Sequence, residues 1–410
     1  MTTWLYLLSS AALYVASFLW IKYCWWGTLL FLTPLFYVAR YKQLTFVQGF
    51  AWGCIVYTAH MSAIWLVCIE YGTGWLRFGA PVATVFWFAI LSGLWFILLK
   101  TRFIIIRYTA TIGFFFFIDS IVLFPFFNCL EGYPFALPLI PLMHGAHLGL
   151  LPTLGKIGLL AGLILIQLLY AYQYFIVPIV VTGLLFFTVP IKQQQGDWKD
   201  QCIGIAHMWK EQQPYERAQE ICHVLIDTIR KHPEKRVVVL PESVFPWPLH
   251  EHEYALKMWT DNALEQTRYL ILGSYRKNNG KLLNTFYIVQ RSRIIFYYDK
   301  THLIPFFEKT NSSPLLKGLN SLFLSTKESF SKSTLYRKWI FRGSRTFTDI
   351  TPLICSEAFW HMPKNKKAIN LVNDAYFRLP YFPRLMRSLA HLNAAEQNTE
   401  LFYCSWRSNF

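Results

Sequence analysis

The sequence predicts an α-helical transmembrane bundle followed by an α/β domain. The chain of 410 residues is 54% hydrophobic, with a mean hydropathy of +0.30, which is more apolar than a soluble protein usually is. Charge is unevenly distributed, because residues 1–190 carry only 8 of the 39 Lys and Arg residues and 3 of the 23 Asp and Glu residues. We therefore expect a polytopic transmembrane domain over residues 1–191 and one globular domain of ordinary size over residues 192–410.

The apolar stretches of the first domain predict about seven spans, since crossing a bilayer takes roughly 20 apolar residues. The first is not a cleavable signal peptide, because it lacks a basic leading segment and a small-residue cleavage site, and further spans follow it. The expected spans lie near residues 3–21, 24–40, 46–68, 79–99, 103–126, 155–171 and 173–191.

Basic residues between the spans predict the orientation. With an internal N-terminus and seven spans, Arg40 with Lys42 and Lys100 with Arg102 are cytoplasmic, as the positive-inside rule requires. The domain from residue 192 onward then faces the periplasm, and one span more or fewer would reverse this orientation.

The net charge of +16 does not indicate a nucleic-acid partner, because the chain has no zinc-finger spacing and no helix rich in Lys and Arg. We expect about half of this excess charge near membrane lipids, where each basic residue contributes roughly 1 kcal/mol of attraction to anionic headgroups. The partners expected from composition are therefore lipids, and the oligomeric state is left open.

No metal site or cofactor site is expected. The eight Cys residues match no metal-binding spacing and no dense disulfide framework. His144 and His147 have a spacing that suits a metal on a helix face, but no carboxylate or Cys nearby completes a ligand set. Asp119 lies in an apolar span and is a functional candidate by default; the alternatives are a neutral carboxyl or a pair with Arg107.

In the second half, strand and helix patterns alternate, which predicts an α/β sheet with helices packed on it. The expected strands cover residues 202–207, 237–240, 269–275, 286–290, 294–298, 350–355 and 368–373, and the expected helices cover 215–231, 251–267 and 384–399. The strands at 286–290 and 294–298 are expected to form a hairpin.

Three reactive side chains each end an apolar run in this domain: Glu242, Lys300 and Cys355. Active residues of such sheets gather at the carboxyl ends of strands, so we expect these three to meet. Taken singly, Cys355 would be a buried structural thiol, Glu242 a helix-capping carboxylate and Lys300 a solvated lysine. Their joint placement in this order favours a catalytic set.

That set suits acyl transfer on a Cys thiol. Glu242 is the candidate base that takes the thiol proton, because the thiolate is the nucleophile. Lys300 and the backbone N–H of Ser356 would stabilise the tetrahedral oxyanion. Glu308 and Glu357 are candidates for orienting the lysine and the base.

At these residues the chain resembles the nitrilase (carbon–nitrogen hydrolase) superfamily, whose Glu-Lys-Cys triad lies on an αββα sandwich. Three segments resemble those of apolipoprotein N-acyltransferases: Tyr298–Glu308, Leu353–Glu357 and Asn373–Phe377. Glu131–Pro134 resembles their Gly-aromatic-Pro loop. Val238–Ser243 and Pro352–Cys355 also resemble segments of the shorter conjugal-transfer TraB family.

The resemblance implies a bacterial inner-membrane enzyme whose catalytic domain faces the periplasm. It implies that an acyl chain passes from phospholipid to Cys355 as a thioester, and then to the N-terminal amine of a lipoprotein. Phe306 and Phe307, within 303–324, are candidates for an apolar lid or for ordinary loop packing. Tyr376 is a further candidate for substrate contact.

Three departures from the acyltransferase pattern accompany the resemblance. Ser356 stands in place of an aromatic residue, Phe307 stands in place of Gly, and the chain ends at Phe410, so we expect a C-terminally short sandwich. Two other functions stay open: an accessory protein of conjugal transfer or secretion that keeps the fold, and a membrane-tethered amidase.

Overall fold

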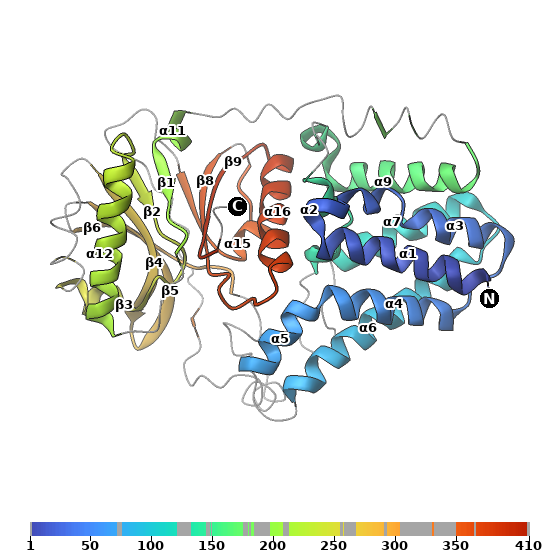
Figure 1. The fold of residues 1–410 in the computed structure, drawn as a ribbon, viewed down its shortest axis with the longest axis horizontal. Helices are drawn as coiled ribbons and strands as arrows, with labels where there is room; N and C mark the ends of the chain where they lie inside the picture. Colours follow the sequence, from blue (N-terminus) through green and yellow to red (C-terminus); the bar gives the residue numbers. More distant parts are fainter. Residues whose placement is uncertain are drawn as a thin grey trace. The chain divides into compact units, whose positions relative to one another are not determined.

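The computed structural model divides the chain into two compact units (Figure 1). The first contains residues 1–192 and 377–396, and the second contains residues 193–376 and 397–410. The residues that the structure describes are 2–71, 76–120, 133–144, 148, 150–174, 179, 182–183, 197–207, 213–254, 257, 268–290, 293–303, 330–331, 350–364 and 366–407.

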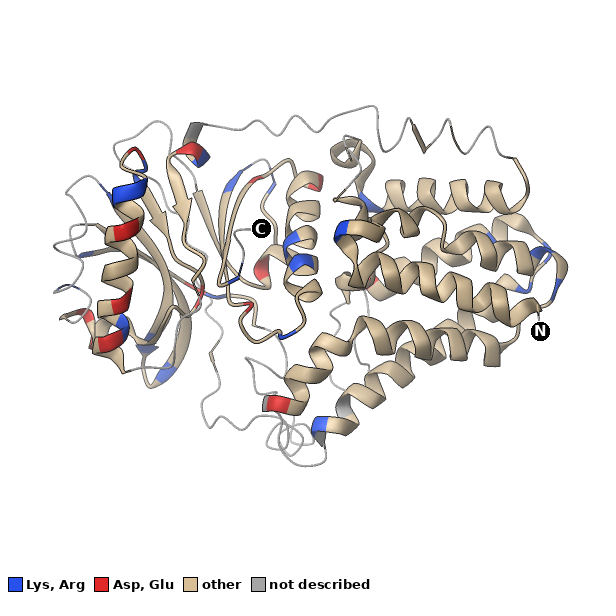
Figure 2. Ribbon diagram, viewed as in Figure 1, with Lys and Arg blue, Asp and Glu red and all other residues tan. Residues whose placement is uncertain are grey.

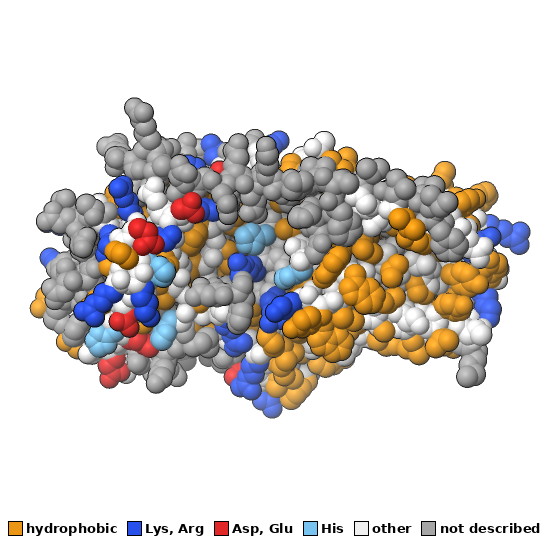
Figure 3. Space-filling view, turned by 45° about the horizontal axis from the view of Figure 1, so that its top comes forward, with side chains coloured by type: hydrophobic (Ala, Val, Ile, Leu, Met, Phe, Trp, Pro, Cys, Tyr) orange, Lys and Arg blue, Asp and Glu red, His pale blue; other side chains and the backbone are white. Residues whose placement is uncertain are grey.

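The first unit is helical. Its elements are α1 (Thr2–Leu19), α2 (Ile21–Cys24), η1 (Trp25–Leu29), α3 (Leu32–Tyr41), α4 (Phe46–His60), α5 (Ser62–Tyr71), α6 (Leu76–Leu99), α7 (Ile104–Ser120), η3 (Pro134–Ala136), α8 (Leu139–Leu142), α9 (Leu151–Ala171) and α16 (Tyr381–Glu396). Apolar side chains cover much of its visible surface (Figure 3). Exposed Leu5, Val47 and Ile105 are suited to contact with lipid tails.

Within the described residues, α1, α6 and α9 are long and apolar enough to cross a membrane. A fourth span is added if α4 and α5, which bend by 61° at their junction, count as one. The span expected at 24–40 is not one helix, because the chain breaks between η1 and α3. The expected span at 173–191 lies almost wholly outside the described residues.

Helix α16 satisfies backbone groups at two helix breaks of this unit. The Tyr381 hydroxyl lies at the α4–α5 break, where it accepts from Ala63 N at 3.1 Å and donates to His60 O at 2.8 Å. At its other end, Glu396 Oε1 accepts from Lys156 N at 2.8 Å, next to the break in α9 at Gly155, whose φ is +67°. Breaks in apolar helices persist where other parts of the protein satisfy the freed groups.

Asp119 is paired with Lys156, not with Arg107. Lys156 Nζ lies 3.9 Å from Asp119 Oδ2 and 3.8 Å from Glu396 Oε2. The Arg107 guanidinium instead donates to main-chain oxygens, among them Thr101 O at 2.7 Å, because it lies at the far end of α7 from Asp119.

The second unit contains two sheets. The first has strands β1 (Cys202–Gly204), β2 (Val237–Val239), β3 (Phe245–Pro248), β4 (Tyr269–Asn278), β5 (Lys281–Gln290) and β6 (Arg293–Asp299), in the order β1-β2-β4-β5-β6 with β3 paired to β4. The second has β7 (Ile350–Ile354), β8 (Lys367–Val372) and β9 (Glu400–Ser405), all parallel. Among the described residues of this unit, the helices are α11 (Asp197–Asp200), α12 (Pro214–Lys231), η4 (Leu249–Glu251) and α15 (Glu357–Trp360).

Helix α12 (Pro214–Lys231) covers one face of the first sheet. Its fully buried Ile221 and Leu225 pack with Val238 of β2, Leu270 of β4 and Tyr287 of β5 in one core cluster. Each such side chain contributes roughly 1.5–3 kcal/mol when fully buried. The apolar side chains that repeat every second residue along the strands and about every 3.6 residues along the helix thus pack in one layer, as the sequence predicts.

The predicted strands are present, with different bounds. The hairpin of β5 and β6 is confirmed by their antiparallel pairing. A second hairpin, between β4 and β5, was not predicted; it turns at Asn279 and Gly280, both with positive φ, so these strands are longer than expected. The helix expected at 251–267 lies mostly outside the described residues.

Candidate active site

The three predicted site residues follow the carboxyl ends of three strands. Glu242 comes shortly after β2, Lys300 directly after β6, and Cys355 directly after β7. All three are buried, with exposed fractions of 4%, 1% and 6%. Charged residues are rarely buried to this degree without partners, so their surroundings decide what they do.

Glu242 and Lys300 form a buried ion pair. Lys300 Nζ lies 3.6 Å from Glu242 Oε1. The same oxygen accepts a hydrogen bond from Asn284 Nδ2 at 2.7 Å, and Oε2 accepts from Asn373 N at 2.8 Å. Because an opposite charge and donated hydrogen bonds favour the ionised form of a carboxylic acid, this environment suits Glu242 as a carboxylate.

The turn around Glu242 leaves no room for larger neighbours. A Cβ atom added to Gly273 of β4 would lie 2.5 Å from Glu242 Cα, so only Gly allows the chain to pass here. Ser243 adopts a φ of +52°, which is unusual for a residue with a side chain. On the other side, Trp406 Nε1 donates to Glu242 O at 2.7 Å.

Cys355 lies on a sharp turn between β7 and α15, with a φ of +49°. Its N–H donates to Leu371 O at 2.7 Å, and Asn370 Nδ2 approaches its carbonyl oxygen at 3.4 Å. A non-Gly residue in this conformation is strained by roughly 1–3 kcal/mol, and such strain gathers at functional sites.

Glu357 connects the Cys355 turn to the Lys300 turn. Its Oε1 accepts from Tyr298 Oη and Thr301 N, both at 2.8 Å, and from His302 N at 3.2 Å. Its Oε2 accepts from Ile354 N at 2.9 Å. One carboxylate therefore binds residues on both sides of Lys300 and the residue just before Cys355. Its role in orienting the lysine and the base stays a prediction.

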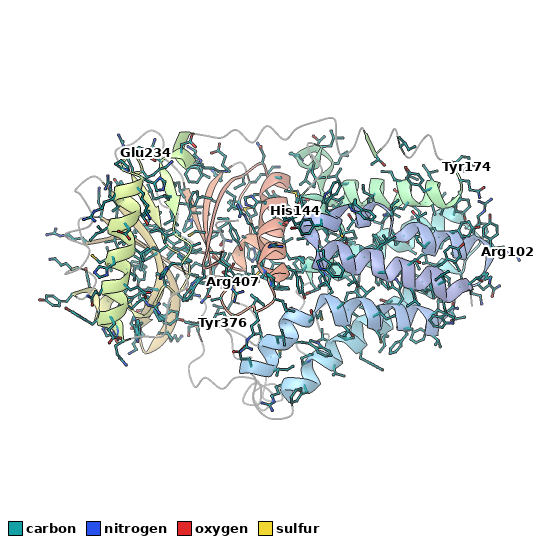
Figure 4. All side chains as sticks on the ribbon, in the orientation of Figure 1. Arg102, His144, Tyr174, Glu234, Tyr376 and Arg407 are labelled. Carbon is teal, nitrogen blue, oxygen red and sulfur yellow. The ribbon has the colours of Figure 1, made fainter. Side chains whose placement is uncertain are left out.

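Ser356, expected to support an oxyanion, is fully buried. Its Oγ donates to His302 O at 3.3 Å, so the side chain is directed to the lysine turn. Glu308, Phe306 and Phe307 lie outside the described residues, and of the expected lid only Leu303, which is buried, lies within them. Tyr376, on the loop after β8, is 45% exposed (Figure 4).

Several polar residues at the site were not predicted. Asn284 and the Asn373 N–H bind Glu242. Arg407 holds the loop after β8, because its N–H donates to Asp374 Oδ1 at 3.0 Å and its Nη2 donates to Ala375 O at 3.1 Å (Figure 4). Asn284 lies in a mostly apolar strand, and an amide at a buried strand position is the signal that could have identified it.

Other buried thiols of this unit have a different environment. Burial raises the pKa of Cys202 to about 12 and that of Cys404 to about 12. The Cys404 thiol donates to Val239 O at 3.3 Å, so it bonds a main-chain group of the neighbouring sheet. Within the described residues, no group of three or more His, Cys, Asp or Glu side chains could hold a metal ion.

The arrangement brings a carboxylate and an ammonium together in a buried place and connects both to a strained Cys turn. A carboxylate so placed can accept a proton, and an ammonium can stabilise a developing oxyanion. These are the groups that acyl or amide transfer through a thiol requires.

Comparison with known proteins agrees with the resemblance that the motifs predict. The chain is 28% identical over 183 residues to the apolipoprotein N-acyltransferases of Brucella suis biovar 1 (strain 1330) and Brucella melitensis biotype 1. In each case the match covers 41% of this chain and 34% of the relative, so it spans about a third of the length of these relatives. No family model matches the chain.

Among solved structures, similar chains include a carbon–nitrogen hydrolase from Helicobacter pylori G27, with a TM-score of 0.36 and 12% identity over 49% of this chain and 70% of that one. Another is Nit3 of Saccharomyces cerevisiae, of the nitrilase superfamily, with a TM-score of 0.34 and 13% identity over 50% of this chain and 74% of that one. The chain is thus similar in part to named apolipoprotein N-acyltransferases and has structural neighbours among the carbon–nitrogen hydrolases.

Proposed function

We propose that this protein is a membrane-bound Cys-dependent N-acyltransferase. It would move an acyl chain from phospholipid to Cys355 as a thioester, and from there to the N-terminal amine of a lipoprotein. The observation that carries the proposal is the buried Glu242–Lys300 pair, which Glu357 connects to the strained Cys355 turn.

In the first half-reaction, Glu242 takes the proton of the Cys355 thiol. The thiolate attacks the carbonyl carbon of the phospholipid ester, and the negative charge that develops on the carbonyl oxygen is stabilised by Lys300 and the Ser356 N–H. The ester C–O bond then breaks, and Glu242 returns the proton to the departing lysophospholipid alcohol.

In the second half-reaction, the free amine of the acceptor attacks the thioester carbonyl. The same groups stabilise the oxyanion, the C–S bond breaks, and an amide forms while Cys355 leaves as a thiolate. The proton lost by the amine passes to Glu242 and then to the thiolate. Once both half-reactions are complete, the three side chains are back in their starting state.

The helical unit suits substrates that are held in a bilayer. Its apolar helices carry few charged residues along their length, and Lys and Arg gather mainly near helix ends (Figure 2). Such basic ends suit anionic headgroups. We propose a multi-pass protein of the bacterial inner membrane whose catalytic domain faces the periplasm.

The test is intact-mass spectrometry of the purified protein after incubation with phospholipid. The wild type should gain the mass of one acyl chain, the adduct should be removed by hydroxylamine, and Cys355→Ala should gain none. Cys404→Ala is the matched control, because it removes another buried thiol of the same sheet and should leave the adduct intact. A folded wild-type protein without any adduct would contradict a phospholipid donor.

A further inference from the structure

Asn284 contacts both charged members of the candidate site. It lies on β5, is 3% exposed, and pairs in register with Tyr275 of β4. Its Nδ2 donates to Glu242 Oε1 at 2.7 Å, and its main-chain oxygen accepts from Lys300 N at 2.8 Å. One residue of a strand that is paired on both sides therefore binds the carboxylate through its side chain and the lysine through its backbone.

The two donors near Glu242 Oε1 are not equivalent. The Asn284 amide lies at an ordinary hydrogen-bond distance of 2.7 Å, whereas the Lys300 ammonium is 3.6 Å away, outside that range. The carboxylate is thus in the field of the ammonium, but the short bond to this oxygen comes from a neutral amide. Of the two groups, the uncharged one makes the closer contact.

The plane of the carboxylate is also fixed. Its second oxygen accepts from Asn373 N at 2.8 Å, at the end of β8, so the two oxygens are held from two different sheets. A carboxylate held through both oxygens cannot rotate without losing a bond. A fixed orientation of this kind suits a carboxylate that must accept a proton from the same neighbour in every catalytic cycle.

We propose that Asn284 is a positioning residue that holds Glu242 ready as the proton acceptor and keeps the Lys300 ammonium from closing onto it. The inference rests on the proposed function in one respect, namely that Glu242 activates Cys355. In this arrangement the Asn284 amide, and not the Lys300 ammonium, makes the short hydrogen bond to Glu242 Oε1. The ammonium can then stabilise the developing oxyanion.

Alkylation of Cys355 by iodoacetamide tests this without any lipid. The rate of alkylation is measured against pH by peptide mass spectrometry in detergent, for the wild type, Asn284→Asp and Asn284→Leu. Asn284→Asp keeps the size of the side chain and places a second carboxylate beside Glu242. Asn284→Leu removes the amide donor. Both changes make the proton on Glu242 harder to remove, by like charge and by loss of a donated bond respectively.

The expected result is an upward shift of the acidic limb of the rate profile, by about one pH unit for Asn284→Asp and by less for Asn284→Leu. At the wild-type midpoint, the Asp variant should then react several times more slowly. Thr285→Val is the matched control: its neighbouring, equally buried hydroxyl bonds Asp299 at 2.8 Å, so its profile should keep the wild-type midpoint.

Coincident profiles for wild type and Asn284→Asp would overturn the inference, as would an equal shift in Thr285→Val, which would indicate a general loosening of β5. If the Leu variant does not fold, the Asp variant carries the test, because it differs from Asn by one atom. If no lipid adduct forms on the wild type but the alkylation profile shifts as expected, the proposed acyl donor is wrong and the role of Asn284 stands.

Discussion

Two ion pairs with buried carboxylates lie at the end of one strand, and they differ in how closely their charges are bound. Asp299 and Lys300 are neighbours at the end of β6. Both carboxylate oxygens of Asp299 accept hydrogen bonds from the Arg276 guanidinium, at 3.0 and 2.5 Å. Asp299 accepts a third bond from Thr285 Oγ1. Lys300 lies 3.6 Å from Glu242.

Under the proposed function, this difference separates a structural charge from a reactive one. The fork of Arg276 and Asp299 is bidentate and closed, and the hydrogen bond to Asp299 raises the pKa of the guanidinium further. The Glu242 side chain is as buried as that of Asp299, but its distance to Lys300 is longer, and a neutral amide makes the short bond to its carboxylate. Burial alone therefore does not mark a reactive charge; the distance and the identity of the donors do.

Removing the charge of Lys300 from the Glu242–Lys300 pair should have the largest effect on rate and stability. Lys300→Met removes the oxyanion partner and should slow acylation of Cys355 by roughly 100- to 1,000-fold. It also leaves the Glu242 carboxylate buried without its counter-charge, at a cost of about 3–5 kcal/mol in unfolding free energy. Acyl-adduct formation followed over time, together with chemical denaturation, measures both quantities.

The double variant Lys300→Met/Glu242→Gln serves as the control for this change. With neither charge of the pair left to bury, it should recover most of the lost stability while the acylation rate stays low. Recovery of the rate in the double variant would contradict the roles assigned to both residues.

Removing the charge of Asp299 from the Arg276–Asp299 pair should affect stability more than the acylation rate. Asp299→Asn leaves the Arg276 guanidinium without its anion and should lower the unfolding free energy by about 3 kcal/mol. The protein that remains folded should acylate within about tenfold of the wild type, because Asp299 makes its bonds away from Glu242. A rate loss as large as that of Lys300→Met would erase the distinction between the two pairs.

A smaller effect is expected at a helix break of the other unit. Tyr381→Phe removes the hydroxyl that serves Ala63 N and His60 O, which should cost about 1 kcal/mol and lower Tm by a few degrees. Tyr41→Phe, which removes the hydroxyl of an exposed tyrosine of the same unit, is the control and should leave Tm unchanged. An unchanged Tm for Tyr381→Phe would mean that other groups satisfy the break.

The smallest effect is expected for the labelling of Cys202 and Cys404, two buried thiols outside the candidate site. Because burial raises the pKa of Cys202 and Cys404 to about 12, both stay protonated at pH 8, well below that value, and should resist iodoacetamide. Cys355 should be labelled much faster under the same conditions. Peptide mapping after a short exposure measures the three sites together, and equal labelling would remove the contrast.

The sequence predicts the parts of the site that depend on one local signal. An apolar β-branched run that stops at a polar residue marks a strand end, and Glu242, Lys300 and Cys355 are found at such ends. Their catalytic roles remain predictions. The pair Asn279-Gly280 is a strong local hairpin signal, and the strand bounds expected from the sequence do not make use of it.

What could not be predicted depends on contacts distant in the chain. Asn284 contacts Glu242 because two conditions hold. Strand β5 lies beside β4, and the turn that carries Glu242 passes over β4 at Gly273, where no side chain fits. Trp406 caps the same turn from 164 positions away. The periodicity of α16 predicts an apolar face, but no pattern along the helix says which partners its polar ends bind.

Helix α16 has a practical consequence for any attempt to divide this protein. In the chain it connects β8 to β9, yet it belongs to the helical unit, where it serves the breaks at Ala63 and Lys156. A polypeptide cut after residue 191 would therefore separate the helical unit from one of its helices and leave apolar side chains of that helix uncovered. The two halves are interleaved along the chain, so each is best expressed, purified and assayed in the presence of the other.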